Sequence, residues 1–383
     1  MAARRLTLRE LNRATLARQG LLDPFATAPV PALVSRVGSL QAQHPDWPPL
    51  ALASRIDAGA ASPDLVTARR ERQIVRASLM RITVHVVATA DYWPMAAVTL
   101  PLRANQWRAV FHLDPVTSPL GRRIAAAHPA VLEEMRGGPL AIHEIETILR
   151  SRLEGLEVPG NRCLWRHFSA SVPLIHVPYE GETYGRSRYL PATQWLDEPS
   201  PGDVEPDAAL GRVIVRYLAA FGPASVDDVA AYIGRGRNRG AVRDAIEALG
   251  SRLVRLADEA GRSLVDLDDA PRPSPAAPAP PRLLARWDSL LLAYGTRDRV
   301  RILPEAHRST VITRNADVLP TFLVDGMVAG TWLPRRDRTG RPSAELRPFG
   351  RLAKGDRAAL EAQAERLLPG LASGAFARYP GTD

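Results

Sequence analysis

The chain has 383 residues, 45% of them hydrophobic, and its 50 Lys and Arg outnumber its 41 Asp and Glu, which gives a formal charge of +9. A chain of this length folds into about two to four compact units, and its positive field attracts polyanions such as nucleic acid. A coding bias towards arginine would give the same charge, so charge alone does not identify the partner. The single cysteine, Cys163, excludes an internal disulfide framework, a multi-cysteine zinc site and a cysteine-ligated iron–sulfur cluster.

Several enzyme classes are excluded by the motifs that the sequence lacks. It has no Gly-rich phosphate loop ending in Lys-Ser or Lys-Thr, no His-Glu-x-x-His and no Gly-x-Ser-x-Gly, which argues against an NTPase, a zinc protease and an esterase. The first residues run into charged side chains instead of the apolar middle of a secretory signal. No stretch approaches the ~20 apolar residues of a membrane helix. We therefore expect a cytoplasmic protein without membrane contact.

The N-terminal region predicts two helices. Thr7 and Glu10 have the spacing of a capping box, which predicts a helix from there to about Gln19. Apolar side chains then recur at helical spacing over residues 30–40, which predicts a second, amphipathic helix.

The second helix leads into two glutamines, and a strand follows. Pro45 disfavours helix in the residue before it, so the helix is expected to end near Gln43 or His44, with Gln41 and Gln43 at its terminus. Residues 74–88 alternate apolar side chains and are typical of a strand with a buried face. The order helix, helix, strand is that of a winged helix.

An internal repeat follows. Segments 138–145 and 222–229 both begin with Gly-Pro and open an amphipathic helix, with a helix before and another after. β-prone runs at 174–177 and 263–267 complete the two copies. One copy alone would suit a plain helical hairpin with a Gly-Pro turn. Two copies in a basic chain favour winged helix-turn-helix modules.

A proline-rich linker at 271–281 separates the last region from the rest. The region after it is β-prone at 309–314, 320–325 and 327–333. Asp325-Gly326 joins the last two runs and is a favoured dipeptide for a tight hairpin. Residues 357–368 predict a closing helix, so the last unit is expected to be a small β-rich domain with a terminal helix.

The segment 36–45 contains Gln41-Ala42-Gln43, and it resembles the glutamine-x-glutamine motif of the AlkZ-like winged-helix DNA glycosylases. Other segments resemble recurring segments of that family, in the same order, over almost the whole chain. They are Leu79-Met80-Arg81-Ile82-Thr83-Val84-His85, Trp287-Asp288-Ser289-Leu290-Leu291 and Val328-Ala329-Gly330-Thr331-Trp332.

The resemblance implies an α+β fold with three tandem winged helix-turn-helix domains and a small C-terminal β-barrel, in a C-shaped architecture that curves around DNA. This agrees with the element order expected from the sequence pattern. The expected units are winged helices at 1–105, 106–200 and 201–270, the linker at 271–281 and a β-barrel-like domain at 282–383.

The resemblance also assigns catalysis to Gln41 and Gln43. A broader branch of the family carries aspartate at the second position, where this chain has Gln43. That difference points to the branch that resembles resistance enzymes, which excise bulky natural-product adducts and unhook interstrand crosslinks. Azinomycin crosslinks are the best-known substrate of that branch. For this chain, the resemblance alone implies which toxin forms the adducts that it removes.

The predicted chemistry suits two neutral amides. Alkylation at purine N7 gives the base a positive charge, so it leaves without a general acid, and an amide needs only to position a water and stabilise an oxocarbenium-like transition state. Glutamine has no useful basicity, so the pair is expected to act only on cationic adducts. We expect a monofunctional glycosylase that acts as a monomer on double-stranded DNA with alkylated or crosslinked guanine, leaves abasic sites and needs no metal or other cofactor.

Candidate DNA contacts lie outside the glutamine motif. Arg186 and Arg188, flanked by Tyr184 and Tyr189, are typical of a basic hairpin that offers phosphate contact and stacking, although an ordinary exposed turn has the same composition. The loop 234–240 places three arginines between glycines, and a solvated loop explains it equally well. Further candidates are Arg235, Arg237, Arg239, Arg81 and His85. His85 is also typical of a hydrogen-bonded core histidine, and Asp288 of a residue that pairs with an arginine or caps a turn.

Two other functions fit the same modules. A winged-helix transcriptional regulator would share the fold and charge, but such regulators normally dimerise, and the sequence has no coiled-coil heptad or other obvious dimerisation segment. A weaker alternative is a protein that sequesters a planar toxin between Trp and Tyr side chains and releases no modified base.

Overall fold

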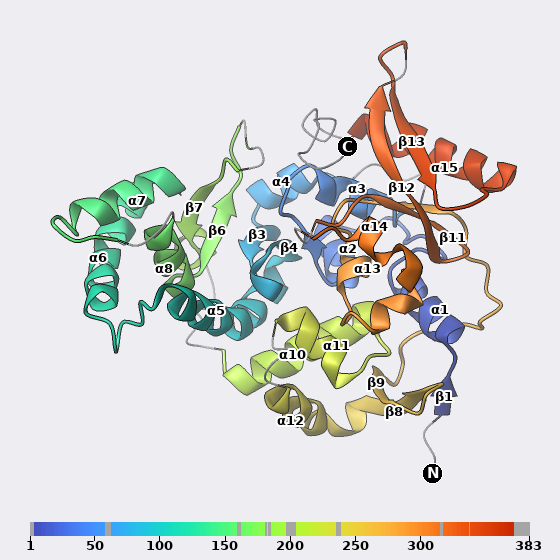
Figure 1. Cartoon of the computed structure of the whole chain (residues 1–383), viewed down its shortest axis with the longest axis horizontal. Helices are drawn as coiled ribbons and strands as arrows, with labels where there is room; N and C mark the ends of the chain where they lie inside the picture. Colours follow the sequence, from blue (N-terminus) through green and yellow to red (C-terminus); the bar gives the residue numbers. More distant parts are fainter. Residues whose placement is uncertain are drawn as a thin grey trace.

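The structure, a computed structural model, describes residues 4–57, 63–158, 162–180, 182, 185–196, 204–234, 239–314, 317–336 and 338–370. They form a mixed α+β protein. The helices α6 (Pro119–Arg136), α7 (Ile142–Ser151) and α8 (Cys163–Ser171) project from one side, and the C-terminal sheet lies on the other (Figure 1). Within these ranges, no helix has the length and apolar character needed to cross a membrane.

The first described elements are β1 (Arg4–Leu6), α1 (Leu8–Arg18), α2 (Val30–Arg36), β2 (Leu40–Gln41) and α3 (Trp47–Ala53). The predicted capping box is confirmed, because the Thr7 hydroxyl accepts from the Glu10 N–H and the Glu10 carboxylate accepts from the Thr7 N–H. The predicted C-terminal end of the second helix is wrong. The helix α2 stops at Arg36, and Gly38, at φ +85°, turns the chain towards a sheet.

The next elements are α4 (Leu65–Arg70), β3 (Ile74–Ser78), a 3₁₀ turn (Met80–Ile82), β4 (Val84–Ala88) and α5 (Thr89–Phe111). The single strand expected over 74–88 is an antiparallel hairpin instead. Arg81 and Ile82 reverse the chain with φ values of 52° and 60°. Neither is a glycine, so the sequence gives no local signal of this turn.

The first Gly-Pro repeat comprises α6 (Pro119–Arg136), β5 (Leu140–Ala141), α7 (Ile142–Ser151), α8 (Cys163–Ser171), β6 (Leu174–Val177), β7 (Arg188–Pro191) and α9 (Ala192–Trp195). The second comprises α10 (Pro206–Phe221), α11 (Val226–Ile233), α12 (Gly240–Ala248), a 3₁₀ turn (Gly250–Arg252), β8 (Leu253–Asp258) and β9 (Ser263–Leu267). The predicted helix order and both predicted strands are confirmed. In each copy an acid in the first turn, Glu144 or Asp228, accepts from the backbone before the helix that follows Gly-Pro.

The C-terminal region contains β10 (Arg282–Leu284), α13 (Ser289–Leu292), 3₁₀ turns at Asp298–Arg301 and Glu305–His307, α14 (Arg308–Val311), β11 (Thr321–Val324), β12 (Met327–Arg336), β13 (Pro342–Pro348), α15 (Lys354–Leu367) and a last 3₁₀ turn (Leu368–Gly370). The predicted Asp325-Gly326 hairpin and the closing helix are confirmed. The strand expected at 309–314 is wrong. Val311 is the last residue of the short helix α14, and its side chain is buried in an apolar core instead of pairing in a sheet.

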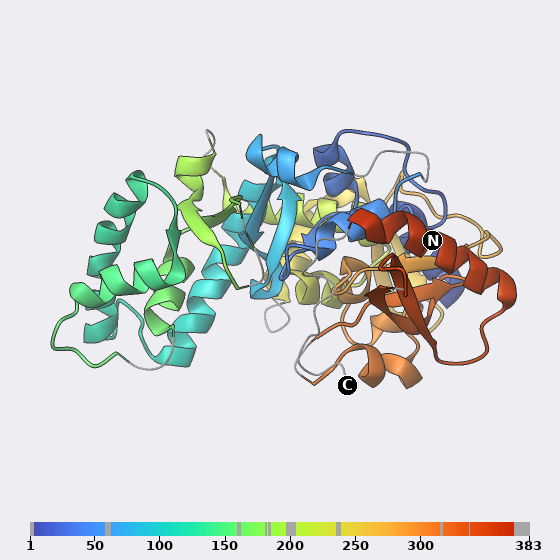
Figure 2. The same cartoon turned by 90° about the horizontal axis from the view of Figure 1, so that it is seen from above.

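The C-terminal sheet has the order β10-β11-β12-β13 and is open in the described part of the chain, so the closed barrel implied by the resemblance is not found there. A second sheet, β2-β4-β3-β6-β7-β5, joins the N-terminal elements to the first repeat, and α5 runs without a break through the boundary expected at 105/106 (Figure 2). The N-terminal strand β1 pairs in parallel with β8. Elements distant in sequence therefore share sheets.

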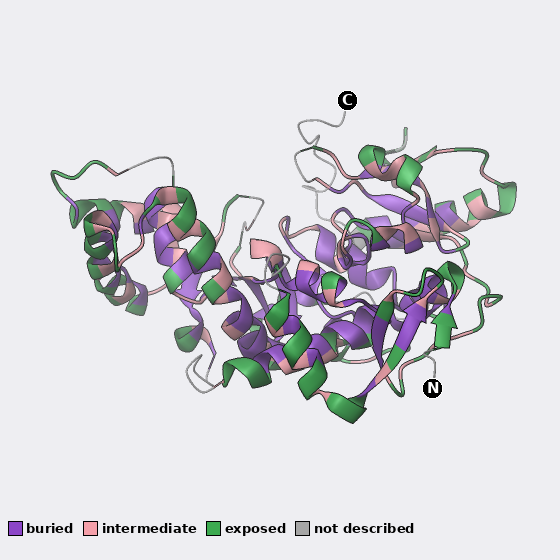
Figure 3. Ribbon diagram, turned by 60° about the horizontal axis from the view of Figure 1, so that its bottom comes forward, coloured by how far each residue is buried: buried purple, intermediate pink, exposed green. Residues whose placement is uncertain are grey.

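The buried residues also bring distant parts of the chain together, except in the first repeat (Figure 3). The first repeat has its own apolar core, built from α6, α7, α8 and the β6–β7 hairpin. The N-terminal and C-terminal regions instead share one core, in which the rings of Trp47 and Trp332 meet edge to face with centroids 5.9 Å apart. Because β2 contributes Leu40 to this shared core, the strand with Gln41 is fixed between the two ends of the chain.

Candidate active site

Gln41 lies in β2, at the edge of the six-stranded sheet, and not at a helix terminus as predicted. The strand pairs with β4, and the Ala42 N–H donates to the Val84 carbonyl over 2.7 Å. Gln41 and His85 are therefore a non-hydrogen-bonded pair, in which the two side chains lie close together on one face of the sheet. The Gln41 N–H points away from β4.

The amide oxygens of both glutamines are held by the protein. Gln41 Oε1 accepts from Arg81 Nη2 at 3.2 Å, and Gln43 Oε1 accepts from the Val84 N–H at 3.3 Å. Among the described residues, neither amide nitrogen has a hydrogen-bond acceptor. Gln41 is 9% exposed and Gln43 is half-buried. The site thus presents two oriented, uncharged amides, each with free N–H groups and a second lone pair on its oxygen.

Ser289 fixes the backbone of the motif from the outer side of β2. Its hydroxyl accepts from the Gln41 N–H at 3.3 Å and donates to the Ser39 carbonyl at 2.7 Å. The Ser39 hydroxyl in turn lies 2.7 Å from the hydroxyl of Tyr232 on α11. Side chains from the C-terminal region and from the second repeat therefore position one short strand.

A buried ionic network supports the opposite face of the motif. Arg76 Nε donates to the Ala42 carbonyl at 3.1 Å, and Arg76 Nη1 lies 2.7 Å from the Glu182 carboxylate. Arg69 binds the same carboxylate at 2.7 Å. Since a buried charge is tolerated only when it is paired, this network holds Ala42 in place.

Asp288 has the structural role expected from the sequence. It forms a two-point ion pair with Arg55 at 2.6 and 3.0 Å, and it accepts from the Leu290 N–H at the start of α13. Both charged side chains are at most 1% exposed. This pair locks the segment that contains Ser289 against the N-terminal region.

Arg81 is half-buried and contacts both Gln41 and α11. Its Nη1 donates to the Tyr232 carbonyl at 3.1 Å, and its guanidinium carbon lies 5.2 Å from the centre of the Tyr232 ring. Burial lowers the pKa of Arg81. Arg81 was expected to contact DNA, and the structure places it beside Gln41.

The assignment of His85 to DNA contact is wrong, because the side chain is 0% exposed. Its Nδ1 lies 2.9 Å from the Thr83 carbonyl, and burial, followed by the charge of Arg81, lowers its pKa to about 3. The ring is therefore neutral and supports Gln41 from inside the sheet. Its Nε2 is buried and has no hydrogen-bond partner among the described residues.

His44 and Asp46 follow the motif and are also mostly buried. His44 Nδ1 lies 3.3 Å from the Asp46 carboxylate. Burial, and then the charges of Arg76 and Arg286, lower the pKa of His44 to about 4, whereas burial raises the pKa of Asp46. Neither residue was selected from the sequence.

Of the predicted basic hairpin at 184–189, residues 185–187 precede β7, and Arg188 and Tyr189 lie in that strand. Arg186 is exposed. Arg188 already donates to the Pro139 carbonyl at 2.9 Å and lies 3.4 Å from Glu144. Tyr189 packs inside, with its ring centre 4.6 Å from that of Trp165, so it is not available to stack on a base. Tyr184 lies outside the described residues.

The Gly-Arg loop follows α11 directly. Arg235 and Arg237 lie outside the described residues. Arg239 is described, and its guanidinium lies 3.1 Å from Asp227, with both side chains about half exposed. Gly234 at the start of the loop has φ +99° and lies against Arg81.

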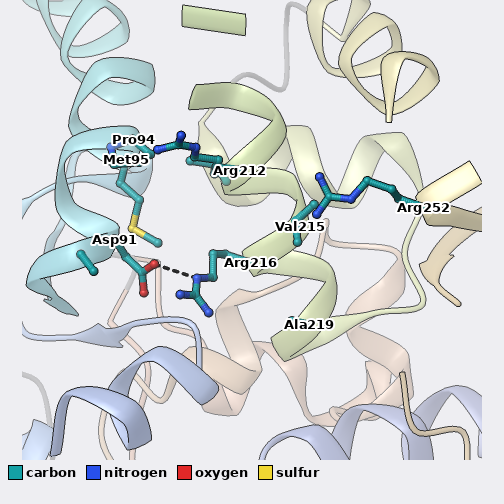
Figure 4. Close-up of a pocket in the computed structure, with 10 residues that line it drawn as sticks. Asp91, Pro94, Met95, Arg212, Val215, Arg216, Ala219 and Arg252 are labelled. Atoms are coloured by element: carbon teal, nitrogen blue, oxygen red, sulfur yellow. Dashed lines mark hydrogen bonds and ion pairs between the residues drawn. The ribbon is translucent and has the colours of Figure 1, made fainter. Parts of the chain in front are cut away.

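A separate pocket of about 280 Å³ lies between α5 and α10 and does not include the glutamines (Figure 4). Its polar lining includes Asp91, which binds Arg216 Nε at 2.7 Å and the Ser35 hydroxyl at 2.6 Å. These contacts tie α2, α5 and α10 together. In the described part of the chain, no group of three or more His, Cys, Asp and Glu is arranged to hold a metal ion.

Sequence reasoning missed Ser289, Ser39, Tyr232 and Arg76. The only signal for Ser289 and Ser39 was their place in segments that resemble the family. The others depend on contacts between regions distant in the chain, which no local pattern reports.

Comparison with known proteins identifies the group to which this arrangement belongs. Residues 34–369 match the family model described as DNA glycosylase AlkZ-like. A curated relative, the interstrand DNA cross-link repair glycosylase of Streptomyces sahachiroi, is 25% identical over 338 residues, or 81% of this chain and 84% of the relative. The solved structure of Streptomyces sahachiroi DNA glycosylase AlkZ is 23% identical and superposes with a TM-score of 0.75, covering 96% of this chain and 97% of that one.

Proposed function

The chain belongs to the AlkZ-like DNA glycosylase family, and from this premise we propose that it releases N7-alkylated, positively charged guanine from duplex DNA. As a DNA glycosylase it is a hydrolase of N-glycosyl bonds. The proposed substrates include bulky natural-product adducts and interstrand crosslinks, which the enzyme would unhook. The name of the curated relative, a cross-link repair glycosylase, supports this choice.

The observation that carries the proposal is the orientation of Gln41 and Gln43. Both amides are fixed through their oxygens, and both are neutral. An amide oxygen keeps a second lone pair that can accept a proton of a water, which directs the water's own lone pair at the sugar carbon. Preorganised dipoles of this kind stabilise charge that develops in the transition state.

The proposed reaction needs no stronger base. The alkylated base already carries a positive charge, so the bond from the sugar C1′ to N9 breaks with its electron pair going to the base, which leaves neutral. Water adds to C1′, and its extra proton passes to solvent. The products are the free base, an abasic site and one proton. A neutral base lacks this driving force, and two amides cannot supply it.

We propose DNA contacts through Arg81, Arg186 and the arginines of the loop after α11, and a monomer as the active form. Arg188 is a weaker candidate, because it is already bound to Pro139 and Glu144. The repeat of helix, Gly-Pro, helix, helix and β-hairpin supports two of the three expected winged helices. We keep the expected domain ranges as the proposed division of the chain.

The test is release of free base from a duplex with a single 7-methylguanine, measured by mass spectrometry under single-turnover conditions. We expect Gln41→Ala and Gln43→Ala each to slow release by at least tenfold. Gln73→Ala is the matched control, because Gln73 is an exposed glutamine just before β3 and its side chain binds only Glu71 among the described residues. Wild-type rates in both site variants would refute the assignment of the two glutamines.

A further inference from the structure

The Arg81 guanidinium lies beside the catalytic amide without a carboxylate partner among the described residues. Its two acceptors, the Tyr232 carbonyl and Gln41 Oε1, are both uncharged. Several other buried arginines are paired with acids, such as Arg55 with Asp288 and Arg18 with Asp266. A guanidinium has five N–H donors, so this cation keeps unused binding capacity.

The backbone holds Arg81 in an uncommon conformation. Arg81 and Ile82 are consecutive residues in the left-handed region, with φ values of 52° and 60°. A β-branched residue rarely adopts this region, and such strain is concentrated at functional sites. Gly234, which ends α11 at φ +99°, packs against this turn, and a Cβ there would lie in ordinary contact with the Arg81 N and Cα atoms, at 3.4 Å.

The surroundings of Arg81 are cationic. Its pKa is lowered by burial and also by the charge of Arg299, which donates to the uncharged Tyr294 carbonyl at 3.2 Å. This field would oppose binding of a cationic lesion next to Gln41 and would raise the energy of an oxocarbenium-like transition state. An anion supplied with the substrate would offset both effects.

We propose that Arg81 binds a backbone phosphate of the DNA directly next to the damaged nucleotide. This inference rests on the proposed function and adds a specific contact to it. One guanidinium would then hold both the phosphate and Gln41 Oε1, so that the position of the strand sets the position of the catalytic amide. The phosphate also supplies the negative charge that a cationic transition state needs close by.

The experiment compares duplexes with 7-methylguanine in which one of the two flanking phosphates is replaced by an uncharged methylphosphonate. For wild type, we expect one of the two replacements to weaken equilibrium binding and single-turnover release by about tenfold. On the native duplex, Arg81→Gln should show the same tenfold loss of binding and release. Replacing the phosphate with methylphosphonate should then weaken this variant no further. It should also lower the slope of log affinity against log salt by about 0.9, the value for one phosphate contact.

Arg103→Gln is the matched control, because Arg103 is a buried arginine that supports the same hairpin by donating to the Ser78 carbonyl at 3.0 Å. It should keep the full sensitivity to the methylphosphonate. Equal methylphosphonate effects on binding in wild type and Arg81→Gln would overturn the inference and leave Arg81 as a cap for α11. The binding measurement requires no base release, so it separates this failure from failure of the proposed chemistry.

Discussion

Ser289 offers the sharpest test of how the fold positions the site. The substitution Ser289→Ala removes the hydroxyl that bonds the Gln41 N–H and the Ser39 carbonyl. Ser39 is 0% exposed and Gln41 is 9% exposed, so both groups lose their partner away from water. An unpaired buried polar group costs about 1–3 kcal/mol, so for two such groups we expect a loss of about 2–6 kcal/mol in the free energy of unfolding.

The effect on catalysis should be larger than this loss of stability suggests. A displacement of the reacting groups by ~1 Å costs about 100-fold in rate. We therefore expect kcat for release of 7-methylguanine to fall about 10- to 100-fold with little change in KM, because the hydroxyl positions an amide and does not touch substrate. Ser289→Thr keeps a hydroxyl and should restore part of the rate.

Thr99→Ala is a suitable control, because it removes another buried hydroxyl, which bonds the Met95 carbonyl within α5. It should lower stability without changing kcat. If Ser289→Ala lost stability as expected but kept the wild-type kcat, the two hydrogen bonds from Ser289 to β2 and Ser39 would not matter for catalysis. That result would refute the reasoning.

Two further predictions concern buried charge. Asp288→Asn leaves the Arg55 guanidinium without its charged partner, and breaking a buried pair costs about 3–5 kcal/mol, which urea denaturation would measure; a loss below 1 kcal/mol would contradict this role. The pKa values of His44 and His85 are lowered to about 4 and about 3, so both rings are neutral in the folded protein. Unfolding takes up protons below their ordinary pKa of about 6.5, so stability should be full above pH 6.5 and fall as pH drops towards 4. A melting temperature that stays constant over this range would exclude that linkage.

Much of the fold could be predicted because its signals are local. The Thr7 and Glu10 capping box, the two Gly-Pro helix starts and the Asp325-Gly326 hairpin each depend on residues within a few positions of one another. Such local motifs predict the same structure independently of contacts with the rest of the chain.

The predictions were wrong where contacts between distant parts of the chain determine the local backbone structure. The strand β2 has only two residues, and it exists because β4 and Ser289 supply its hydrogen bonds, so its sequence alone continued the helical pattern. The turn at Arg81 and Ile82 contains no residue that favours positive φ, and it is stabilised by contact with α11. A sequence pattern cannot report either partner.

The candidate site was predictable in part. Gln41 and Gln43 were selected only through a resemblance, because two polar residues near an expected helix end carry no chemical signal of their own. Their support by Arg76, Tyr232 and Ser289 became visible only in three dimensions. Arg81 was selected as a DNA contact, which stays a prediction, and its hydrogen bond to Gln41 was not expected from the sequence.

The central claim is that the leaving base supplies its own positive charge. The most direct measurement compares single-turnover release by the wild-type enzyme from two duplexes, one with 7-methylguanine and one with 7-methyl-7-deazaguanine, which has nearly the same shape but no charge. We expect release of the cationic base and no detectable release of the neutral one. Equal rates for the two bases would contradict the claim.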